Sequence, residues 1–257
     1  MVFCVFGNKQ ESVPDAHVVL DASNGSTFDT RVNTANKHSI SQAFNTTGSN
    51  KKGEIISDTL LDGTSGYVLN CLSHSNIKVQ DLTSSVYPGT PSYTLMLVFK
   101  NKTSIGTTTD DYTHDKDRIM SFDENNNNDN IYVKFNADNT ISLNHATRIG
   151  NGFTELASSI HTFNDLQYNV LIMTRSRDRL TYKVFLNGCV IISHTLPDYT
   201  KVPEYPHGNP TDPAQIFYQY ARDLVAPRGL YRIYELKQWE ETLTDSQIST
   251  LYASYTS

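Results

Sequence analysis

The chain contains little cysteine, and its three cysteines stand far apart at Cys4, Cys71 and Cys189. No CxxC pair or Cys/His cluster occurs, so neither a disulfide framework nor a zinc site is indicated. With 257 residues the chain can bury enough surface to fold without such cross-links. We therefore expect the three cysteines to be small buried or incidental residues.

Long hydrophobic runs are missing as well. No stretch approaches the roughly 20 apolar residues that a membrane-spanning helix needs. The apolar start, Val2–Phe6, has no basic residues before it and is shorter than the core of about 7–15 residues in a secretory signal. We expect neither a membrane span nor a signal peptide.

Positive charge is scarce, since 21 Lys and Arg stand against 27 Asp and Glu and give a net charge of −6. A protein that binds phosphates would be expected to be basic, so a nucleic-acid partner is not expected. The chain is rich instead in aromatic residues, with 15 Tyr and 11 Phe. This composition is typical of a soluble, strand-rich protein.

Sequence motifs of catalysis are absent too. GxSxG, Walker, HExxH and dinucleotide-binding patterns do not occur, and the eight histidines are scattered. Glu235, Glu240 and Glu241 come closest to a carboxylate pair, but their spacing indicates solvated charges at the edge of a strand. We expect no enzyme activity.

The pattern of apolar residues predicts many short strands. A first strand is expected at Ala16–Asp21, and residues 22–65 read as loop with one or two short strands. The continuous apolar run Tyr93–Phe99 predicts a strand buried on both faces. Further strands are expected at 66–71, 76–80, 131–135, 141–143, 168–173, 180–186, 189–194 and 230–239.

Two local signals are stronger. Asn187-Gly188 between two apolar runs predicts a type I′ hairpin turn. Thr244 with Gln247 forms a capping box, and Leu243 with Ile248 forms a hydrophobic staple, so a helix is expected after Thr244. Many strands and a single terminal helix favour an all-β sandwich.

Three pieces of the chain together resemble the laminin G-like or concanavalin A-like lectin/glucanase superfamily. They are Gly66-Tyr-Val-Leu-Asn70 with Ile77-Lys-Val79 and Tyr93–Phe99, then Tyr168–Thr174 with Tyr182–Gly188, and finally Ile233–Trp239 running into Leu243–Ile248. The resemblance implies an antiparallel jelly-roll sandwich in which the strand near Ala16 pairs close to the last one. It implies one domain over 1–257, with 1–65 as strand and loops and 66–252 as the core.

The superfamily includes lectins, adhesion modules, polysaccharide-cleaving enzymes and structural pieces, so function must be argued from the site. Its glycosidases carry two carboxylates as E-x-D-x-x-E, a pattern that this chain lacks. The resemblance therefore favours a non-catalytic module that binds a glycan or a glycoprotein surface. The alternatives are an assembly component, for instance of a virion or surface layer, and, ranked last, a polysaccharide-cleaving enzyme.

Residues 197–228 hold six of the nine prolines, which lower the cost of holding a long loop in one shape. The segment carries aromatic rings beside amide and carboxylate groups, the mixture that holds a sugar ring. Ordinary packing at the rim is the simpler interpretation. The predicted ligand-binding residues are Tyr199, Tyr205, His207, Asn209, Asp212 and Tyr218.

The loop over residues 123–130 offers hard oxygen donors of the kind that calcium prefers. Asp123, Asn125 and Asp129 are the predicted ligands, with a merely solvated asparagine-rich loop as the alternative.

Two further segments carry hypotheses. Residues 1–7 are too apolar for water and could add a strand to this domain or to a neighbouring subunit, which would give a homo-oligomer. Arg175, Arg177 and Arg179 are interpreted most simply as the charged tip of a hairpin, although three arginines could also dock an acidic glycan. An extracellular, cell-surface or virion-surface location is favoured over the cytoplasm.

Overall fold

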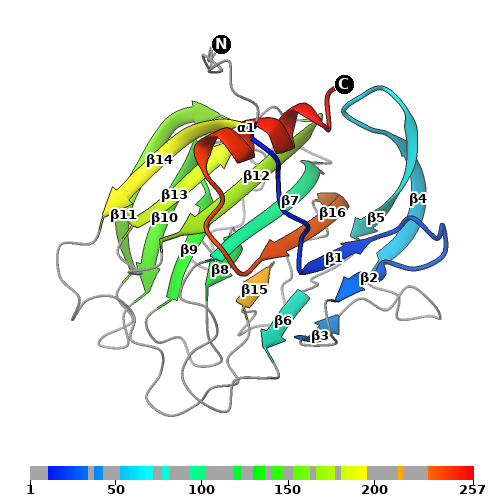
Figure 1. Cartoon of the computed structure of the whole chain (residues 1–257), viewed down its shortest axis with the longest axis horizontal. Coiled ribbons are helices and arrows are strands. Elements are labelled where there is room, and N and C mark those ends of the chain that lie inside the picture. The colour runs from blue at the N-terminus through cyan, green and yellow to red at the C-terminus, as the bar shows by residue number, and fades with distance from the viewer. Residues whose placement is uncertain are drawn as a thin grey trace.

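The structure is a computed structural model of the whole chain. It describes residues 11–33, 38–42, 53–71, 77–81, 93–101, 118–122, 130–136, 140–146, 153–162, 166–176, 181–195, 214–216 and 231–257. Within these residues the chain forms two antiparallel sheets, here sheet A and sheet B, and one short helix (Figure 1).

Sheet A has nine strands. They are β1 (Val18–Asp21), β2 (Asp29–Asn33), β4 (Gly53–Thr59), β5 (Ser65–Cys71), β7 (Tyr93–Asn101), β12 (Tyr168–Arg175), β13 (Thr181–Leu186), β14 (Cys189–Thr195) and β16 (Tyr231–Trp239). The order is β14-β13-β12-β7-β16-β1-β2, and β5 pairs with β16 and with β4.

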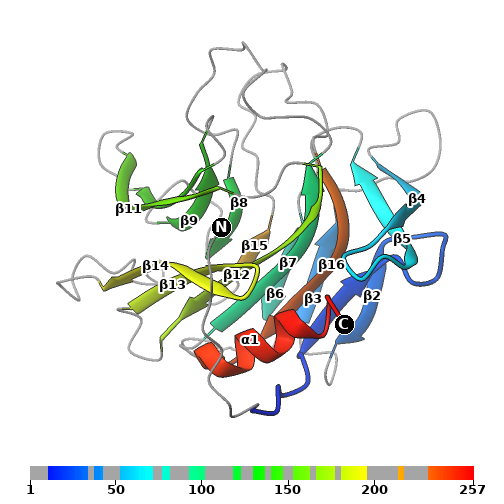
Figure 2. The same ribbon diagram turned by 90° about the horizontal axis from the view of Figure 1, so that it is seen from above.

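Sheet B has seven strands. They are β3 (His38–Gln42), β6 (Ile77–Asp81), β8 (Arg118–Phe122), β9 (Asn130–Phe135), β10 (Thr140–Ala146), β11 (Phe153–Thr162) and β15 (Ala214–Ile216), in the order β11-β10-β9-β8-β15-β6-β3. Figure 2 shows this sheet facing sheet A, so the molecule is the predicted β-sandwich.

The first and last strands of the chain lie side by side. Val18–Asp21 runs antiparallel to β16, with Asp21 opposite Glu235. The same long strand β16 pairs on its other side with β7 over most of its length. The expected pairing of the strand near Ala16 with the terminal strand is confirmed.

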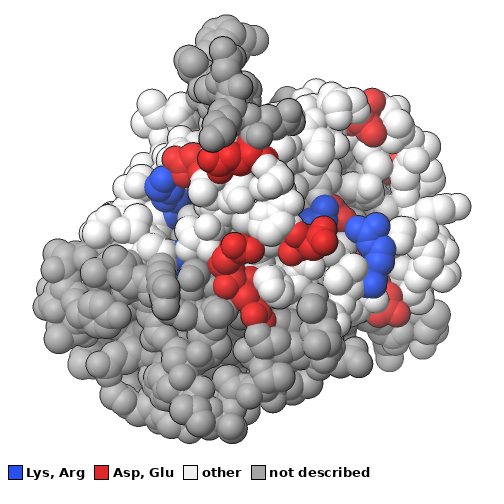
Figure 3. All heavy atoms as spheres, viewed as in Figure 1, with Lys and Arg blue, Asp and Glu red and all other residues white. Residues whose placement is uncertain are grey.

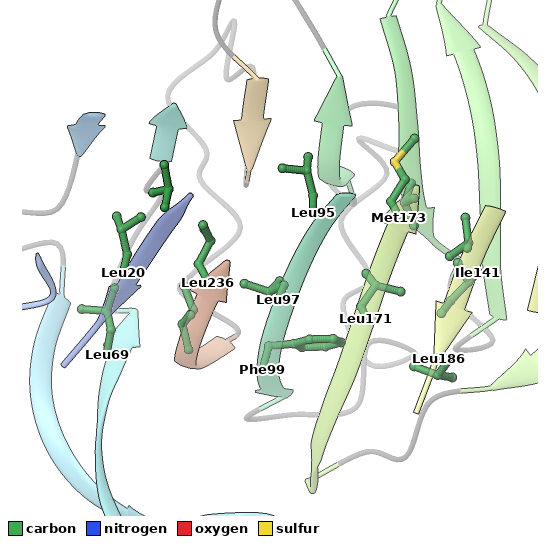
Figure 4. Packing of buried hydrophobic residues seen from close by; sticks show 14 of the residues in the cluster. Leu20, Leu69, Leu95, Leu97, Phe99, Ile141, Leu171, Met173, Leu186 and Leu236 are labelled. Atoms are coloured by element: carbon green, nitrogen blue, oxygen red, sulfur yellow. The ribbon is translucent and has the colours of Figure 1, made fainter. Parts of the chain in front are cut away.

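One apolar core fills the space between the sheets. Strand β7 sends Leu95, Leu97 and Phe99 into it, and sheet B contributes Ile141 and Leu143 (Figure 4). All five side chains are fully buried. Burying one such side chain contributes about 1.5–3 kcal/mol, so this core holds the two sheets together.

A second core covers the outer face of sheet A. Met96 and Val98, which alternate with the residues above, point to this face and meet the helix α1 (Asp245–Ala253). The helix presents Ile248 and Leu251, and the single tryptophan, Trp239, is buried beside them. Figures 1 and 2 show α1 lying against this outer face. Strand β7 is thus buried on both faces, as its apolar run predicts.

The predicted helix boundary is confirmed. The Thr244 hydroxyl accepts a hydrogen bond from the Gln247 backbone N–H at 3.1 Å, and the Thr244 N–H donates to the Gln247 side chain at 2.9 Å. Leu243 and Ile248, the predicted staple, are both buried. Thr244 therefore caps α1 as a complete capping box.

Several predictions about the strands are wrong. Residues 22–65 contain three strands, β2, β3 and β4, rather than one or two. The proline-rich segment is not all loop, because Ala214–Ile216 forms β15. Arg175 is not at an exposed hairpin tip but is buried within β12; Arg177 and Arg179 lie outside the described residues.

The expectation for the cysteines is also corrected in part. Cys71 is buried in the core between the sheets, as expected. Cys189, at the start of β14, is disulfide-bonded and so is not incidental. Cys4 lies outside the described residues, as do residues 1–7 altogether.

Candidate functional site

The residues predicted to bind a ligand lie outside the described part of the chain. This holds for Tyr199, Tyr205, His207, Asn209, Asp212 and Tyr218, and equally for Asp123, Asn125 and Asp129. Their roles stay predictions. The structure does describe the strands from which these segments leave and to which they return.

Strand ends to which the two predicted sites are attached lie at the same end of sheet B. Strands β8 and β9 form a hairpin with Phe122 opposite Ile131, so the predicted calcium loop connects two adjacent strand ends. Strand β15 lies beside β8, with Gln215 opposite Ser121. Continuing this antiparallel register by one residue places Ala214 opposite Phe122, so both residues lie at the same end of sheet B. We call this the loop end of sheet B, defined by Phe122, Asn130 and Ala214.

The topology divides the predicted glycan residues. Five of them belong to the segment that enters β15 at the loop end, namely Tyr199, Tyr205, His207, Asn209 and Asp212. Tyr218 belongs to the segment that leaves β15 after Ile216, at the opposite end of this strand. Three residues of strand span about 10 Å, so these two attachment points are separated by that distance.

A row of polar side chains follows β10 toward the loop end. Ile141 and Leu143 point into the core between the sheets, so Ser142 and Asn144, which alternate with them, point to the other face of sheet B. The Asn144 amide donates to the Ser142 hydroxyl at 2.8 Å, and the Asn136 amide donates to the Thr140 hydroxyl at 2.9 Å. We call Asn136, Thr140, Ser142 and Asn144 the polar row.

The neighbouring strand extends the polar row with exposed groups. In β11, Ser158 lies opposite Ser142 and Glu155 lies opposite Asn144, and both are exposed. Ser142 and Asn144 themselves are buried. Hydroxyl and amide groups both donate and accept hydrogen bonds, which is the chemistry that the hydroxyls of a neutral sugar require.

Sequence reasoning missed this row. The signal was present in the alternation Ile141-Ser142-Leu143-Asn144, where small polar residues occupy the positions that face away from the core. The sequence alone does not reveal that β10 pairs with β11, because this pairing has an irregular register.

The outer face of sheet A carries a charged cluster around Asp58 of strand β4. Its carboxylate accepts hydrogen bonds from Lys100 Nζ at 3.1 Å, from Arg232 Nη1 at 3.0 Å and from Tyr168 Oη at 3.0 Å. Burial acts to raise the pKa of Asp58, but the hydrogen bonds from Lys100, Arg232 and Tyr168 outweigh it and lower this pKa from 3.8 to about 2. The cluster ties the β4–β5 hairpin to the strands beneath it.

A second charged cluster surrounds Glu235. Arg31 bridges the Glu235 and Asp21 carboxylates at 2.9 Å each, and Lys237 Nζ lies 2.9 Å from Glu235. The Tyr255 hydroxyl also donates to Glu235. Burial raises the pKa of Tyr255, and the negative charge of Glu235 raises it further.

The expectation that Glu235 is a solvated edge charge is therefore wrong. Its side chain is buried, and three donors occupy its oxygens. Glu235 lies opposite Asp21 in the strand register, and the same arginine, Arg31, binds both carboxylates. This arrangement joins β1, β2, β16 and the residues after α1, which is a structural role.

On the face on which α1 lies, the described residues are mostly uncharged, with scattered patches of Asp and Glu and some of Lys and Arg (Figure 3). Among the described residues no group of three or more His, Cys, Asp or Glu is arranged to hold a metal ion. No helix in this part of the chain is long and apolar enough to cross a membrane.

Comparison with known proteins gives a structural likeness only. No family model matches the chain, and no curated protein does. Domain 4 of AbnA, an extracellular arabinanase of family GH43 from Geobacillus stearothermophilus solved with arabinotriose, aligns with a TM-score of 0.56 and 19% identity. The alignment covers 92% of this chain and 98% of that domain.

Binding domains of botulinum neurotoxins are also similar. The domain of neurotoxin DC solved with rat synaptotagmin II aligns with a TM-score of 0.54 and 11% identity over 94% of this chain. The serotype D domain solved with N-acetylneuraminic acid aligns with a TM-score of 0.54 and 13% identity over 93%. The chain spans about half the length of these toxin domains, 52% and 50% respectively. At such identities these likenesses establish the fold alone, a β-sandwich.

Proposed function

We propose that this protein is a non-catalytic carbohydrate-binding module with a concanavalin A-like sandwich, and that it belongs to an extracellular or surface-exposed protein. The glycan is held at the loop end of sheet B by the segments that carry Tyr199, Tyr205, His207, Asn209 and Asp212. Ser158, which is exposed beside the buried polar row, forms part of the floor.

The observation that carries this proposal is the likeness to domain 4 of the arabinanase. That domain was solved with arabinotriose, and the chain matches 98% of its length. The toxin domains give weaker support, because their ligands can lie in the half that this chain does not match. A neutral oligosaccharide is therefore the first ligand to test.

Ser158 offers an exposed hydroxyl beside the polar row, and Glu155 is an exposed carboxylate described next to it. Both groups accept hydrogen bonds from the hydroxyls of a neutral sugar.

Titration calorimetry with arabinotriose, preceded by a glycan array for other sugars, tests the proposal. We expect binding that weakens about ten-fold or more in Tyr205→Ala, a loss of about 1.4 kcal/mol or more. Tyr67→Ala, which removes a half-exposed ring from sheet A, should bind like the unmodified protein. If no glycan binds on the array or in calorimetry, the proposal is contradicted.

The proposal includes calcium as a cofactor of the loop between Phe122 and Asn130. Glycan binding should then fall on addition of a chelator and return with calcium, and Asp123→Asn with Asp129→Asn should abolish this response. Asp62→Asn, a change in an exposed turn of sheet A, is the matched control. Glycan binding that does not change on addition of the chelator would remove calcium from the proposal and leave the carbohydrate-binding role intact.

The non-catalytic assignment has its own test. An oligosaccharide recovered in shorter fragments after overnight incubation with the protein would overturn this assignment.

A further inference from the structure

The turn between β1 and β2 contains an acceptor motif for N-linked glycosylation. Asn24, Gly25 and Ser26 form an Asn-X-Ser sequence in which X is not proline. An asparagine in such a motif can carry an oligosaccharide in the folded protein only where it lies at the surface. The same motif occurs at Asn45 and at Asn101, but neither of these copies lies completely within the described residues.

The acceptor side chain in this turn is open to solvent. Asn24, Ser26 and Thr27 are all exposed. The Asn24 Nδ2 donates a hydrogen bond to the Thr27 hydroxyl at 2.7 Å, and the Asn24 Oδ1 accepts one from the Ser26 N–H at 2.8 Å. The Ser26 hydroxyl lies 3.3 Å from the same oxygen. These partners belong to the turn itself, so a sugar on Nδ2 would displace no part of either core.

The middle residue of the motif faces the protein instead. Gly25 has a φ of 73°, and a Cβ at this position would lie 3.0 Å from the Tyr67 ring of β5. Gly25 therefore packs against the β4–β5 hairpin, whereas Asn24 presents its amide to solvent. Figures 1 and 2 both show the connection between β1 and β2 at the outer edge of the molecule. A bulky group attached there points away from both sheets.

The disulfide at Cys189 gives an independent indication of the compartment. A short motif is weak evidence by itself in a chain so rich in Asn, Ser and Thr. Cys189, however, is disulfide-bonded, and disulfides form and persist mainly in the secretory pathway and outside the cell. N-linked oligosaccharides belong to secreted proteins as well. The bonded cysteine and the accessible motif thus indicate the same route through the cell.

We propose that Asn24 is an acceptor site for an N-linked oligosaccharide. The donor is an oligosaccharide on a polyprenyl diphosphate, and a transferase of the host catalyses the transfer. The Asn24 Nδ2 attacks the anomeric carbon of the first sugar and forms the C–N bond. The bond between this carbon and the diphosphate oxygen breaks, and the diphosphate leaves with the electron pair. Nδ2 gives up one of its two protons, and no group is oxidised or reduced.

This modification is separate from the ligand of the proposed function. The turn that carries Asn24 connects two strands of sheet A, whereas the loop end belongs to sheet B. A covalently attached oligosaccharide remains on the denatured chain, and a bound ligand does not. Failure of either proposal therefore leaves the other standing.

Mass spectrometry of the full chain, secreted from a eukaryotic cell line behind a cleavable signal, tests the proposal. Trypsin should release residues 10–31 as one peptide, in which Asn24 is the only asparagine. We expect most of this peptide to carry an oligosaccharide that peptide N-glycosidase removes. Recovery of the peptide without sugar would contradict the proposal, even if Asn45 or Asn101 were modified.

Variants in the turn separate the motif from its surroundings. Asn24→Gln and Ser26→Ala should each abolish the modification of this peptide, whereas Ser26→Thr keeps the hydroxyl and should keep the sugar. Thr27→Ala is the matched control, because it removes the partner of the Asn24 Nδ2 without changing the motif, and it should remain modified. Sugar that persists on the peptide in Asn24→Gln would assign the modification to a hydroxyl group and overturn the proposal.

Discussion

Asn187 and Gly188 determine how three strands meet. Both residues have positive φ, 50° and 79°, as a type I′ turn requires. The Asn187 side chain also accepts a hydrogen bond from the Val170 N–H at 2.8 Å, which joins the turn to β12. A side chain at residue 188 would collide with Tyr252, so glycine is needed both for its conformation and for the space.

Asp58 is the residue whose ionisation we expect to affect stability most clearly. Its pKa is lower in the folded protein, about 2, than its ordinary value of 3.8. Its carboxylate therefore stabilises the fold above about pH 4, and this contribution is lost as the pH falls toward 2. Asp58→Asn should lower the free energy of unfolding by about 1–3 kcal/mol at pH 7.

Urea unfolding at several pH values measures this effect. The difference between the unmodified protein and Asp58→Asn should shrink between pH 4 and pH 2. Asp15→Asn makes the same charge change at an exposed position and should have little effect at either pH. A difference for Asp58→Asn that is constant over this range would contradict the assigned cause.

Helix α1 shows which elements a sequence can predict. Its capping box, its staple and its buried face are all local patterns, and each is found where the pattern indicates. Strand β2 has no such signal, since four of its five residues are polar and most of it is exposed. Strand β15 is only three residues long and forms because β6 and β8 flank it.

The same distinction applies to the candidate site. Residue types in 123–130 and 197–228 could suggest ligands, but only strand pairing shows that Phe122, Asn130 and Ala214, where these segments attach, lie at one end of sheet B. The polar row likewise depends on alternation in β10 and on its register with β11. Local composition does not determine which distant strands pair with each other.

Thr244→Ala tests the cap of α1. Loss of the hydroxyl leaves the Gln247 N–H and the Glu11 carboxylate without this partner, so we expect the free energy of unfolding to fall by about 1 kcal/mol. Thr244→Ser keeps the hydroxyl and should behave like the unmodified protein. Equal losses in both variants would mean that the Thr244 methyl group, rather than the cap, stabilises this end of the helix.

The whole molecule has two cores that share sheet A. Leu97 lies in the core between the sheets, whereas Trp239 lies in the core under α1. Strand β7 contributes to both, so a change in one core is transmitted to the other through a common strand. We therefore expect one cooperative domain.

The single tryptophan makes this expectation measurable. Trp239 fluorescence and far-UV circular dichroism should give coincident urea unfolding curves. Leu97→Ala should shift both curves together, by about 2–5 kcal/mol. A fluorescence transition that precedes the loss of strand signal would show that the helix layer unfolds separately.

The position of β15 has a consequence for the order in which the protein can be built. Sheet B has β6 and β8 on either side of a strand that is synthesised almost a hundred residues after β8. Sheet A likewise needs β16 between β7 and β1. A chain emerging from the ribosome therefore cannot complete either sheet until its last strands have been made. Until then, the edges of the neighbouring strands remain unpaired.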